Sequence, residues 1–244
     1  MIYSQFQPHS SLSNYIDAYW TAKGNSKRPV IEKILPDGCI DIIFNLGDEC
    51  STDNGNLVMK SEGIYLVGTM TRFKETLVNA DTNLLGIRFK PGAASAFISF
   101  SPLYQITNRT VELEKSFSFD AKKIIQNPLH YLDCYFNNEL KAPNFYLLEV
   151  IETIRQSKGQ IKVGALMQKH FTTSRQLERA FRQHVGVTPK DYINLVRYQN
   201  AMIAVRQRMP NQSLLSIAVD FGYYDHSHLT NEFKRYGGAA PTLA

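Results

Sequence analysis

The chain has 244 residues, of which 43% are hydrophobic and 20% charged, proportions typical of a protein that buries a core. Its longest apolar runs, such as "IDIIFNL", are much shorter than the roughly 20 residues of a membrane-spanning helix, and the N-terminus lacks the pattern of a secretory signal. We therefore expect a cytoplasmic protein with no membrane partner, long enough for two domains.

The net charge of +5 is unevenly distributed along the chain. Residues 1–144 contain 14 Lys and Arg against 15 Asp and Glu, whereas residues 145–244 contain 13 against 7. The C-terminal hundred residues therefore carry a net charge of +6. Such a basic segment indicates a polyanionic partner, most simply nucleic acid, although a solvated helical surface has the same composition.

Short runs rich in β-branched and aromatic residues alternate with turn-forming segments between residues 29 and 89. The runs are "VIEKIL", "IDIIFNL", "IYLVGTM" and "NLLGIRF", and the turns contain "PDG", "GDECSTDNGN" and "NADTN". This rhythm predicts antiparallel β-structure, as a sandwich or a small barrel. From a short helix begun near Pro91, we expect helical structure to continue to the end, with helices near 120–138 and 145–157.

The polar segment "NNELKAPN", residues 137–144, contains a proline that interrupts the helical pattern, so we place a domain boundary there. The predicted fold class is α+β. Residues 1–142 are expected to form a β-rich domain that ends in helices and that senses a ligand or dimerises, and residues 143–244 are expected to form an all-α domain.

Two segments of the all-α part share one frame. "SRQLERAFRQHVGVTP" (174–189) and "HSHLTNEFKRYGGAAP" (226–241) carry Leu, Phe, Gly and Pro at equivalent places, 52 positions apart. Thr173 and Asp225 stand where a helix N-cap is favoured, and a shorter helical stretch precedes each segment. Each unit is therefore predicted to be a helix-turn-helix whose second helix is the repeated segment.

Both second helices, predicted over 173–184 and 225–236, have one apolar and one polar face, because residues spaced by three, four and seven lie on one side of a helix. The polar faces consist of Arg175, Glu178, Arg179 and Arg182 in the first helix and of Ser227, Thr230, Asn231 and Lys234 in the second.

The stretch "SLLSIAVDFGYYDHSHLTNEFKRYGGAAP" resembles the signature of the AraC-type family of bacterial transcription regulators, and residues 150–241 resemble that family's DNA-binding domain. The matching residues are Leu177, Arg179, Phe181, Gly186, Pro189, Arg197, Ala201, Ile217, Ala218, Phe221, Gly222, Asp225, Ser227, Leu229, Phe233, Lys234 and Pro241. The resemblance implies two helix-turn-helix units joined by one helix, residues 190–207, in a sequence-specific, non-enzymatic regulator that responds to an effector.

Motif position assigns the base contacts to Arg175, Glu178, Arg179, His226, Ser227, Thr230 and Asn231. Arg182 and Lys234 lie a turn further along and suit phosphates. The partners implied are double-stranded DNA, a small-molecule effector, RNA polymerase if the protein is an activator, and a second copy in a homodimer. Asn231 stands where the family commonly has Arg, which implies a second unit that binds more weakly.

The segments "LPDGCIDIIFNL" and "GIRFKPGAASAFISF" resemble the sensor region of a subset of these regulators, for which a cupin-like barrel is expected. Residues 10–129 contain no histidine, so the His cluster of a metal cupin is missing, and we expect no metal and no other cofactor. Trp20, Arg72 and Arg88 are the candidates for a ligand pocket. The competing interpretation is a core tryptophan and two surface arginines.

Two further patterns could suggest an enzyme. Asp37 and Asp41 flank Gly38 as a carboxylate pair would, but a turn aspartate and a solvated strand residue explain them better. His226 and His228 are spaced i, i+2, which points them apart on a helix and disfavours a metal site. The alternative function is a β-domain enzyme or small-molecule carrier with an attached DNA-binding tail, which the missing catalytic constellation disfavours.

Overall fold

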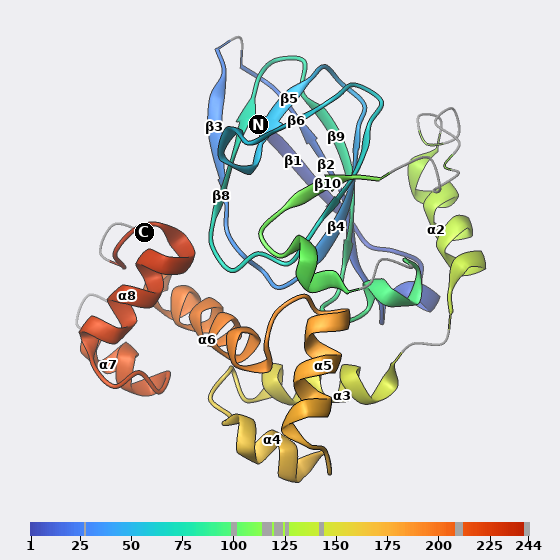
Figure 1. The fold of residues 1–244 in the computed structure, drawn as a ribbon. Coiled ribbons are helices and arrows are strands. Elements are labelled where there is room, and N and C mark those ends of the chain that lie inside the picture. The colour runs from blue at the N-terminus through green and yellow to red at the C-terminus, as the bar shows by residue number, and fades with distance from the viewer. Residues whose placement is uncertain are drawn as a thin grey trace.

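The protein is described by a computed structural model that covers residues 1–26, 28–98, 102–113, 119, 124, 127–141, 144–207 and 212–241. A β-rich N-terminal domain is followed by an all-helical C-terminal domain, which confirms the α+β class (Figure 1). The boundary predicted between residues 142 and 143 falls on two residues outside the described part of the chain.

A six-stranded antiparallel sheet forms the centre of the N-terminal domain, in the order β1-β2-β9-β4-β7-β10. Two smaller sheets, β3-β8 and β5-β6, accompany it, an arrangement compatible with a cupin-like fold. The strands are β1 Ile2–Phe6, β2 Ile16–Lys23, β3 Val30–Ile34, β4 Ile40–Asn45, β5 Cys50–Thr52, β6 Leu57–Met59, β7 Ile64–Val67, β8 Lys74–Val78, β9 Asn83–Phe89 and β10 Thr110–Glu112.

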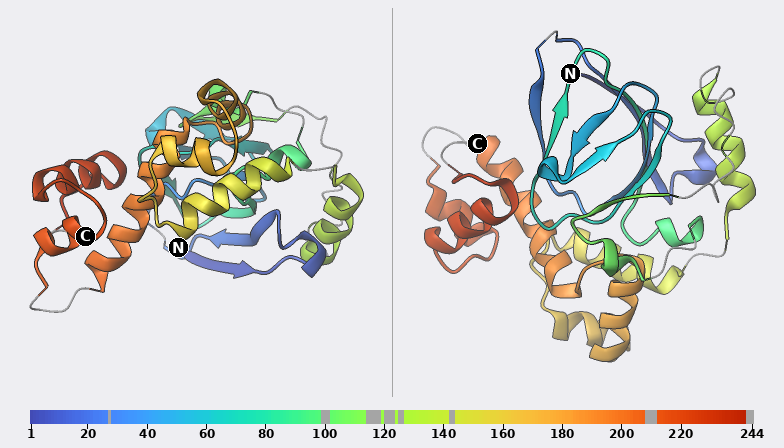
Figure 2. Two further views of the ribbon diagram at one scale, coloured as in Figure 1. Left: turned by 90° about the horizontal axis from the view of Figure 1, so that it is seen from below. Right: turned by 45° about the horizontal axis from the view of Figure 1, so that its top comes forward.

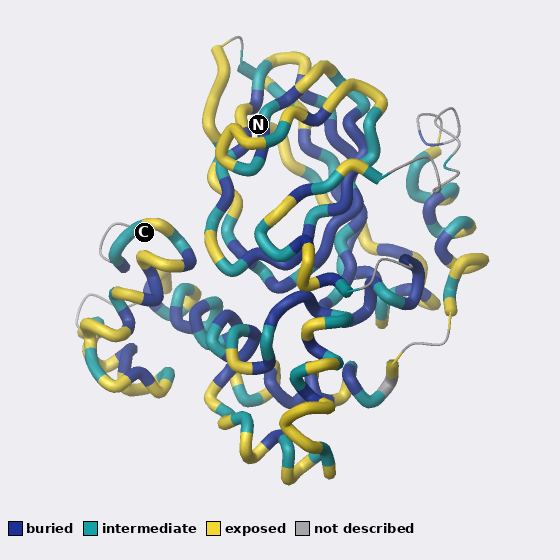
Figure 3. Tube along the Cα trace, viewed as in Figure 1, coloured by how far each residue is buried: buried dark blue, intermediate teal, exposed yellow. Residues whose placement is uncertain are grey.

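Side chains alternate between the two faces of the main sheet, and each face is buried against something different. On one face, Tyr19, Ile42 and Ile87 pack with Phe136 of helix α2 (Pro128–Glu139) in the main core. On the other face, Trp20 packs in a second cluster with residues of β5 and β6. Figure 3 shows these central strands as largely buried. The second face, toward the small sheets, encloses the cavity that Trp20 lines.

The expected order of elements is wrong in two places. Strands β1 and β2 precede the predicted start of β-structure at residue 29, and β10 pairs with β7 inside a region expected to be helical. The helix expected from Pro91 is a short 3-10 turn at Ala94–Ala96, followed by another at Leu103–Ile106. Tertiary pairing explains β10, since the three residues Thr110–Glu112 are too few to show a period of their own.

The C-terminal domain contains the helices α3 Phe145–Gln156, α4 Val163–Lys169, α5 Ser174–His184, α6 Pro189–Arg206, α7 Leu214–Asp220 and α8 His226–Gly237. They form two cores, one under α3, α4 and α5 and one under α7 and α8. Helix α6 belongs to both: Tyr192 and Val196 lie in the first core, and Tyr198 and Ala201 lie in the second. The two predicted helix-turn-helix units and their joining helix are confirmed.

The two domains touch along α5 and α6, and α6 extends beyond the β-rich domain to carry α7 and α8 (Figure 2). Gln199 of α6 donates a hydrogen bond to the carbonyl of Pro36 at 3.2 Å. Gly38, two residues after Pro36 in the same turn, has φ +81°. It lies so close to Tyr192 that an added Cβ would sit 3.0 Å from the tyrosine ring. The turn between β3 and β4 is therefore fitted to the joining helix. Among the helices that the structure describes, none is long and apolar enough to cross a membrane.

Candidate nucleic-acid interface

Helix α5 is fixed at both ends by local hydrogen bonds. The Thr173 hydroxyl accepts from the Gln176 backbone N–H at 3.3 Å, and the Gln176 side chain accepts from the Thr173 N–H at 3.1 Å, which completes a capping box. Gly186 follows the helix with φ +91°, the left-handed conformation that glycine adopts at no steric cost. Leu177 and Phe181 are fully buried, so the opposite face of the helix is presented to solvent.

The polar face of α5 contains the residues expected to meet DNA. Arg175, Arg179 and Arg182 are exposed and Glu178 is half-buried. Glu178 and Arg182 form an i, i+4 ion pair at 3.4 Å. This pair holds two of the four side chains in one arrangement on the surface. Arg179 lies between its two members in sequence, and Arg175 lies one turn nearer the start of the helix.

Helix α8 repeats the design with another cap. The Asp225 carboxylate accepts from the His228 N–H at 2.7 Å, and Leu229 is fully buried below it. His226, Ser227, Asn231 and Lys234 are exposed, and Thr230 is half-buried. The His228 ring lies edge-on against Tyr223, with ring centroids 5.3 Å apart, so the two histidines point to different surroundings. In the described residues, no group of three or more His, Cys, Asp or Glu side chains is gathered for a metal ion.

A buried ion pair attaches α8 to α6, and sequence reasoning missed it. Arg197 donates to the Glu232 carboxylate at 3.1 Å and to Asn194 at 3.0 Å, and side-chain exposure is only 15% for Arg197 and 9% for Glu232. Glu232 lies 52 positions after Ala180, a small residue on the inner side of α5. The available signal was a charged residue between the apolar positions Leu229 and Phe233.

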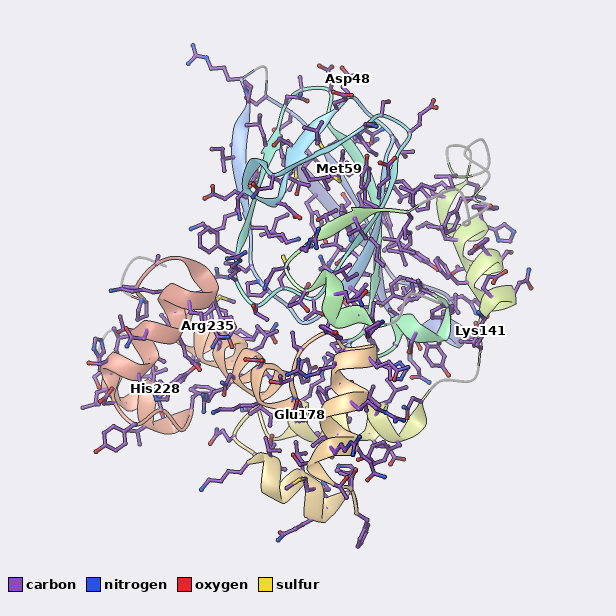
Figure 4. The ribbon with its side chains drawn as sticks, in the orientation of Figure 1. Asp48, Met59, Lys141, Glu178, His228 and Arg235 are labelled. Atoms are coloured by element: carbon purple, nitrogen blue, oxygen red, sulfur yellow. The ribbon has the colours of Figure 1, made fainter. Side chains whose placement is uncertain are left out.

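The second helices of the two units, α5 and α8, are the recognition helices, and they lie on either side of α6. Figure 4 shows Glu178 of α5 and His228 of α8 with the joining helix between them. The 18 residues of α6 span about 27 Å at 1.5 Å per residue, and major grooves on one side of DNA recur about every 34 Å. One helix with its end turns can therefore set the separation of two successive grooves.

Comparisons with known proteins agree with this geometry. Residues 166–243 match the family described as a helix-turn-helix domain, and residues 4–112 match a domain of unknown function (DUF6597). An uncharacterized HTH-type transcriptional regulator of Haemophilus influenzae is 28% identical over 93 residues, 38% of this chain and 30% of that protein. The HTH-type transcriptional activator RhaS of Pectobacterium carotovorum is 29% identical over 82 residues, 34% of this chain and 29% of that protein.

Among solved structures, ToxT from Vibrio cholerae superimposes with a TM-score of 0.50 at 10% identity, covering 100% of this chain and 97% of that one. This likeness shows a shared two-domain fold. The present chain spans about 30% of the length of the curated relatives it matches. The C-terminal part of the chain, residues 166–243, is a helix-turn-helix domain of the AraC type.

Two of the three predicted pocket residues meet in the N-terminal domain. A cavity of about 380 Å³ lies between the main sheet and the small sheets, and both Trp20 and Arg88 line it. The Trp20 indole donates to Asp41 at 2.7 Å, and Arg88 lies 3.4 Å from Asp41 and 3.3 Å from Asp37. Arg72 is exposed and lies outside the cavity lining, as the competing interpretation of a surface arginine expects.

The interpretation of Asp41 as a solvated strand residue is wrong. Strand register places Asp41 directly opposite Arg88, and the carboxyl is buried. Burial raises the pKa of Asp41 to about 6, although Arg88 beside it acts in the opposite direction. Asp37 is a turn aspartate as expected, since its carboxylate accepts from the Cys39 N–H at 2.9 Å. The two carboxylates do share a site, and Arg88 is the group between them.

Two further residues build the cavity without a sequence signal. Gly86 faces Trp20 across strands β9 and β2, and an added Cβ would lie 2.0 Å from the indole, so only glycine leaves room for that ring. Lys74 is 4% exposed and pairs with Asp53 at 2.7 Å. Burial lowers the pKa of Lys74 against the pull of Asp53. The cavity therefore offers an aromatic wall and charged groups of both signs.

Segments that line the cavity also hold the helical domain. Val67 and Met70 line the cavity, and Thr69 between them donates to the carbonyl of Val185 at the end of α5. Lys33 also lines the cavity, and its ammonium lies 3.4 Å from the carbonyl of Gly237 at the end of α8. The same part of the N-terminal domain thus lines the cavity and contacts both α5 and α8.

Proposed function

We propose that the protein is a sequence-specific DNA-binding transcription regulator in which α5 and α8 enter two successive major grooves. The observation that carries the proposal is the pair of capped helices with exposed polar faces, set apart by the 18-residue helix α6. The charge of the C-terminal hundred residues supports it, because a net +6 favours a polyanion. The relatives named above carry the same class of domain.

The base contacts follow from the chemistry of each exposed side chain. Arg175 and Arg179 can grip the O6 and N7 atoms of guanine, and Glu178 can accept from cytosine N4. In α8, Asn231 can pair with adenine, and the remaining contacts are assigned to His226, Ser227 and Thr230. The phosphate contacts are assigned to Arg182 and Lys234.

Selection of bound sequences from random DNA by the full chain tests this function. We expect a non-palindromic site of about two helical turns, because the two recognition faces differ. Binding to that site should fall by orders of magnitude between about 50 and 200 mM salt, as phosphate contacts release counterions. Retention of no preferred sequence would contradict the proposal.

We further propose that a small molecule in the N-terminal cavity adjusts DNA binding. The cavity touches the helical domain through the turn at Pro36 and Gly38 on α6 and through Thr69 at the end of α5. A ligand that moves Arg88 away from Asp37 would therefore act on a segment seated against the joining helix. ToxT from Vibrio cholerae has been solved with an unsaturated fatty acid bound.

The chain itself provides a probe of the cavity, because Trp20 is its only tryptophan. Binding of a ligand beside the indole should change the fluorescence of the full chain. A compound found in this way should also change the affinity for the selected DNA site. Gly86→Ala forces the Trp20 ring from its position and should abolish the fluorescence response to the ligand. DNA binding by the ligand-free protein should be unchanged in this variant.

The remaining elements of the function are proposals of the same kind. We propose that the protein acts in the cytoplasm, where it meets DNA, that it has no catalytic activity, and that a homodimer, if formed, uses residues 1–144. RNA polymerase is the partner expected of an activator. The alternative is a β-domain enzyme or carrier with a DNA-binding tail, and turnover on a metabolite panel without retention of any specific DNA would favour it.

A further inference from the structure

Phe171, in the turn between α4 and α5, is unfavourably placed for the folded protein alone. Its backbone has φ +49°, in the left-handed region where a bulky side chain is strained. Its side chain is 98% exposed, so its ring contributes no burial to either core. The backbone strain and the exposure of the apolar ring therefore both disfavour a phenylalanine at this position.

The second unit shows what the fold itself requires here. Gly222 follows the last turn of α7 just as Phe171 follows that of α4, and it has φ +72°. The left-handed backbone is thus common to both turns, and glycine meets it without strain. The second turn is one residue longer and carries an exposed aromatic ring two positions later, in Tyr224, which is 90% exposed. Each unit therefore presents one solvent-exposed aromatic ring one or two residues before the N-cap of its second helix.

The position of these rings identifies the surface that covers them. A recognition helix enters the major groove with its N-terminal residues at the base edges, so the residues just before the N-cap lie at the rim of the groove. Phe171 is two residues before the cap Thr173, and Tyr224 is one residue before the cap Asp225. The basic side chains Lys169 and Arg175 flank Phe171 in sequence. Figure 1 places both turns away from the β-rich domain, at the free side of the helical domain.

We infer that Phe171 and Tyr224 are DNA contacts that pack against the C5-methyl group of a thymine at the rim of each major groove. That methyl group is the apolar feature of the major groove, and phenylalanine is among the side chains that contact it. This contact would give Phe171 the burial that the free protein denies it. The inference rests on the proposed DNA-binding function and adds a specificity determinant to each unit.

The test combines protein variants with modified DNA. Phe171→Asn removes the ring and installs a residue that tolerates the left-handed backbone. Each thymine of the selected site is replaced in turn by deoxyuridine, which lacks only the methyl group. We expect Phe171→Asn to melt at the same or a higher temperature than the wild type and to bind the site about tenfold more weakly, the scale of one base contact. One deoxyuridine should weaken the wild type equally and leave the variant unaffected.

Two controls separate this contact from other causes. Because the ring is uncharged, Phe171→Asn should leave the salt dependence of binding unchanged, unlike a lost phosphate contact. Ile31→Thr removes a comparably exposed apolar side chain, 63% exposed on β3, and should not change DNA affinity. Tyr224→Ser should reproduce the effect at a thymine of the other half of the site.

If Phe171→Asn bound the site selected by the wild-type chain with unchanged affinity, this inference would be overturned and the proposed DNA-binding function would stand. A weakened variant that kept full sensitivity to every deoxyuridine would overturn the thymine contact. If the wild-type chain selected no DNA sequence, the proposed function would fail, and this inference would fail with it.

Discussion

The two helix-turn-helix units share a scaffold and differ in what lies on it and beneath it. The first presents three arginines and a glutamate, whereas the second presents serine, threonine, asparagine and lysine. Beneath the helices, Ala180 in the first unit corresponds to the buried Glu232 in the second. The comparison teaches that capping and apolar spacing define the unit, while the outer residues are free to specify different sequences.

The N-terminal domain contacts the two units at equivalent positions, but its hydrogen bonds to them differ in strength. It reaches the C-terminal end of each recognition helix, at Val185 and Gly186 in the first and at Gly237, the equivalent of Val185, in the second. In the first unit, two threonine hydroxyls make these bonds. In the second, one lysine makes a bond of 3.4 Å. The first unit is therefore the more firmly attached.

Removal of the buried carboxylate should have the largest effect and should separate the units most clearly. Glu232→Ala makes the second unit resemble the first, but it leaves Arg197 without its partner in a nearly buried position. We expect the free energy of unfolding to fall by about 3 kcal/mol, measured by urea denaturation. The double variant Arg197→Met, Glu232→Leu should regain much of that loss. A single variant as stable as the wild type would show that the pair is not needed to hold α8.

Insertion of five base pairs between the halves of the selected DNA site should be almost as damaging. It rotates one groove by about half a turn, and α6 cannot stretch to follow. We expect an affinity loss of about 100-fold, or roughly 2.7 kcal/mol, in a gel-shift titration. Equal binding to both sites would mean that one unit makes all the contacts. Residues 220–235 contain three acidic residues against two basic ones, so that unit would be the first.

Two arginines of one helix should respond differently to removal. Arg179→Ala should change which base is preferred in the first half of the site, at a cost of about 1–3 kcal/mol, because a base contact is lost. Arg182→Ala should weaken binding to all sequences alike and make the salt dependence shallower. Repeating the selection with each variant checks both. If both variants keep the wild-type sequence preference, the base contact assigned to Arg179 is wrong.

The smallest effects concern attachment to the N-terminal domain. Thr69→Val keeps the side-chain shape and removes the donor to Val185, so we expect a loss of about 1 kcal/mol in unfolding free energy. Lys33→Met at the second unit should cost less, because its bond is long and exposed. Urea midpoints of the two variants give the comparison, and the reverse ranking would contradict the difference in attachment described above.

The helical domain was predictable because its signals are local. Caps, glycine stops and apolar spacing all lie within a few residues of one another, as in the capping box of Thr173 and Gln176. The cavity was only partly predictable, because its residues meet through pairing between distant strands. Lys74 reads as a surface lysine until Asp53, 21 residues away, is placed beside it. Asp41 reads as solvated until register sets it opposite Arg88.

The N-terminal strands were missed for a different reason. Strand β1 is mostly exposed, so its sequence lacks the alternation that marks a half-buried strand. Strand β2 is buried on both faces, which replaces alternation by a continuous run around Tyr19 and Trp20. The exposed Phe171 also escaped sequence analysis, because its significance depends on a backbone angle and on an exposure that only the structure gives.

The turn at Pro36 and Gly38 is seated on α6 and joined to the cavity by Asp37 and Arg88, so under the proposed function it would place DNA and effector in one thermodynamic cycle. Any factor by which a bound molecule changes the affinity for DNA must equal the factor by which DNA changes the affinity for that molecule. The selected DNA site would then itself act as an effector of the cavity. Titration of the unliganded chain with its DNA site should register in the emission of Trp20, which lies in the N-terminal domain and outside α5 and α8.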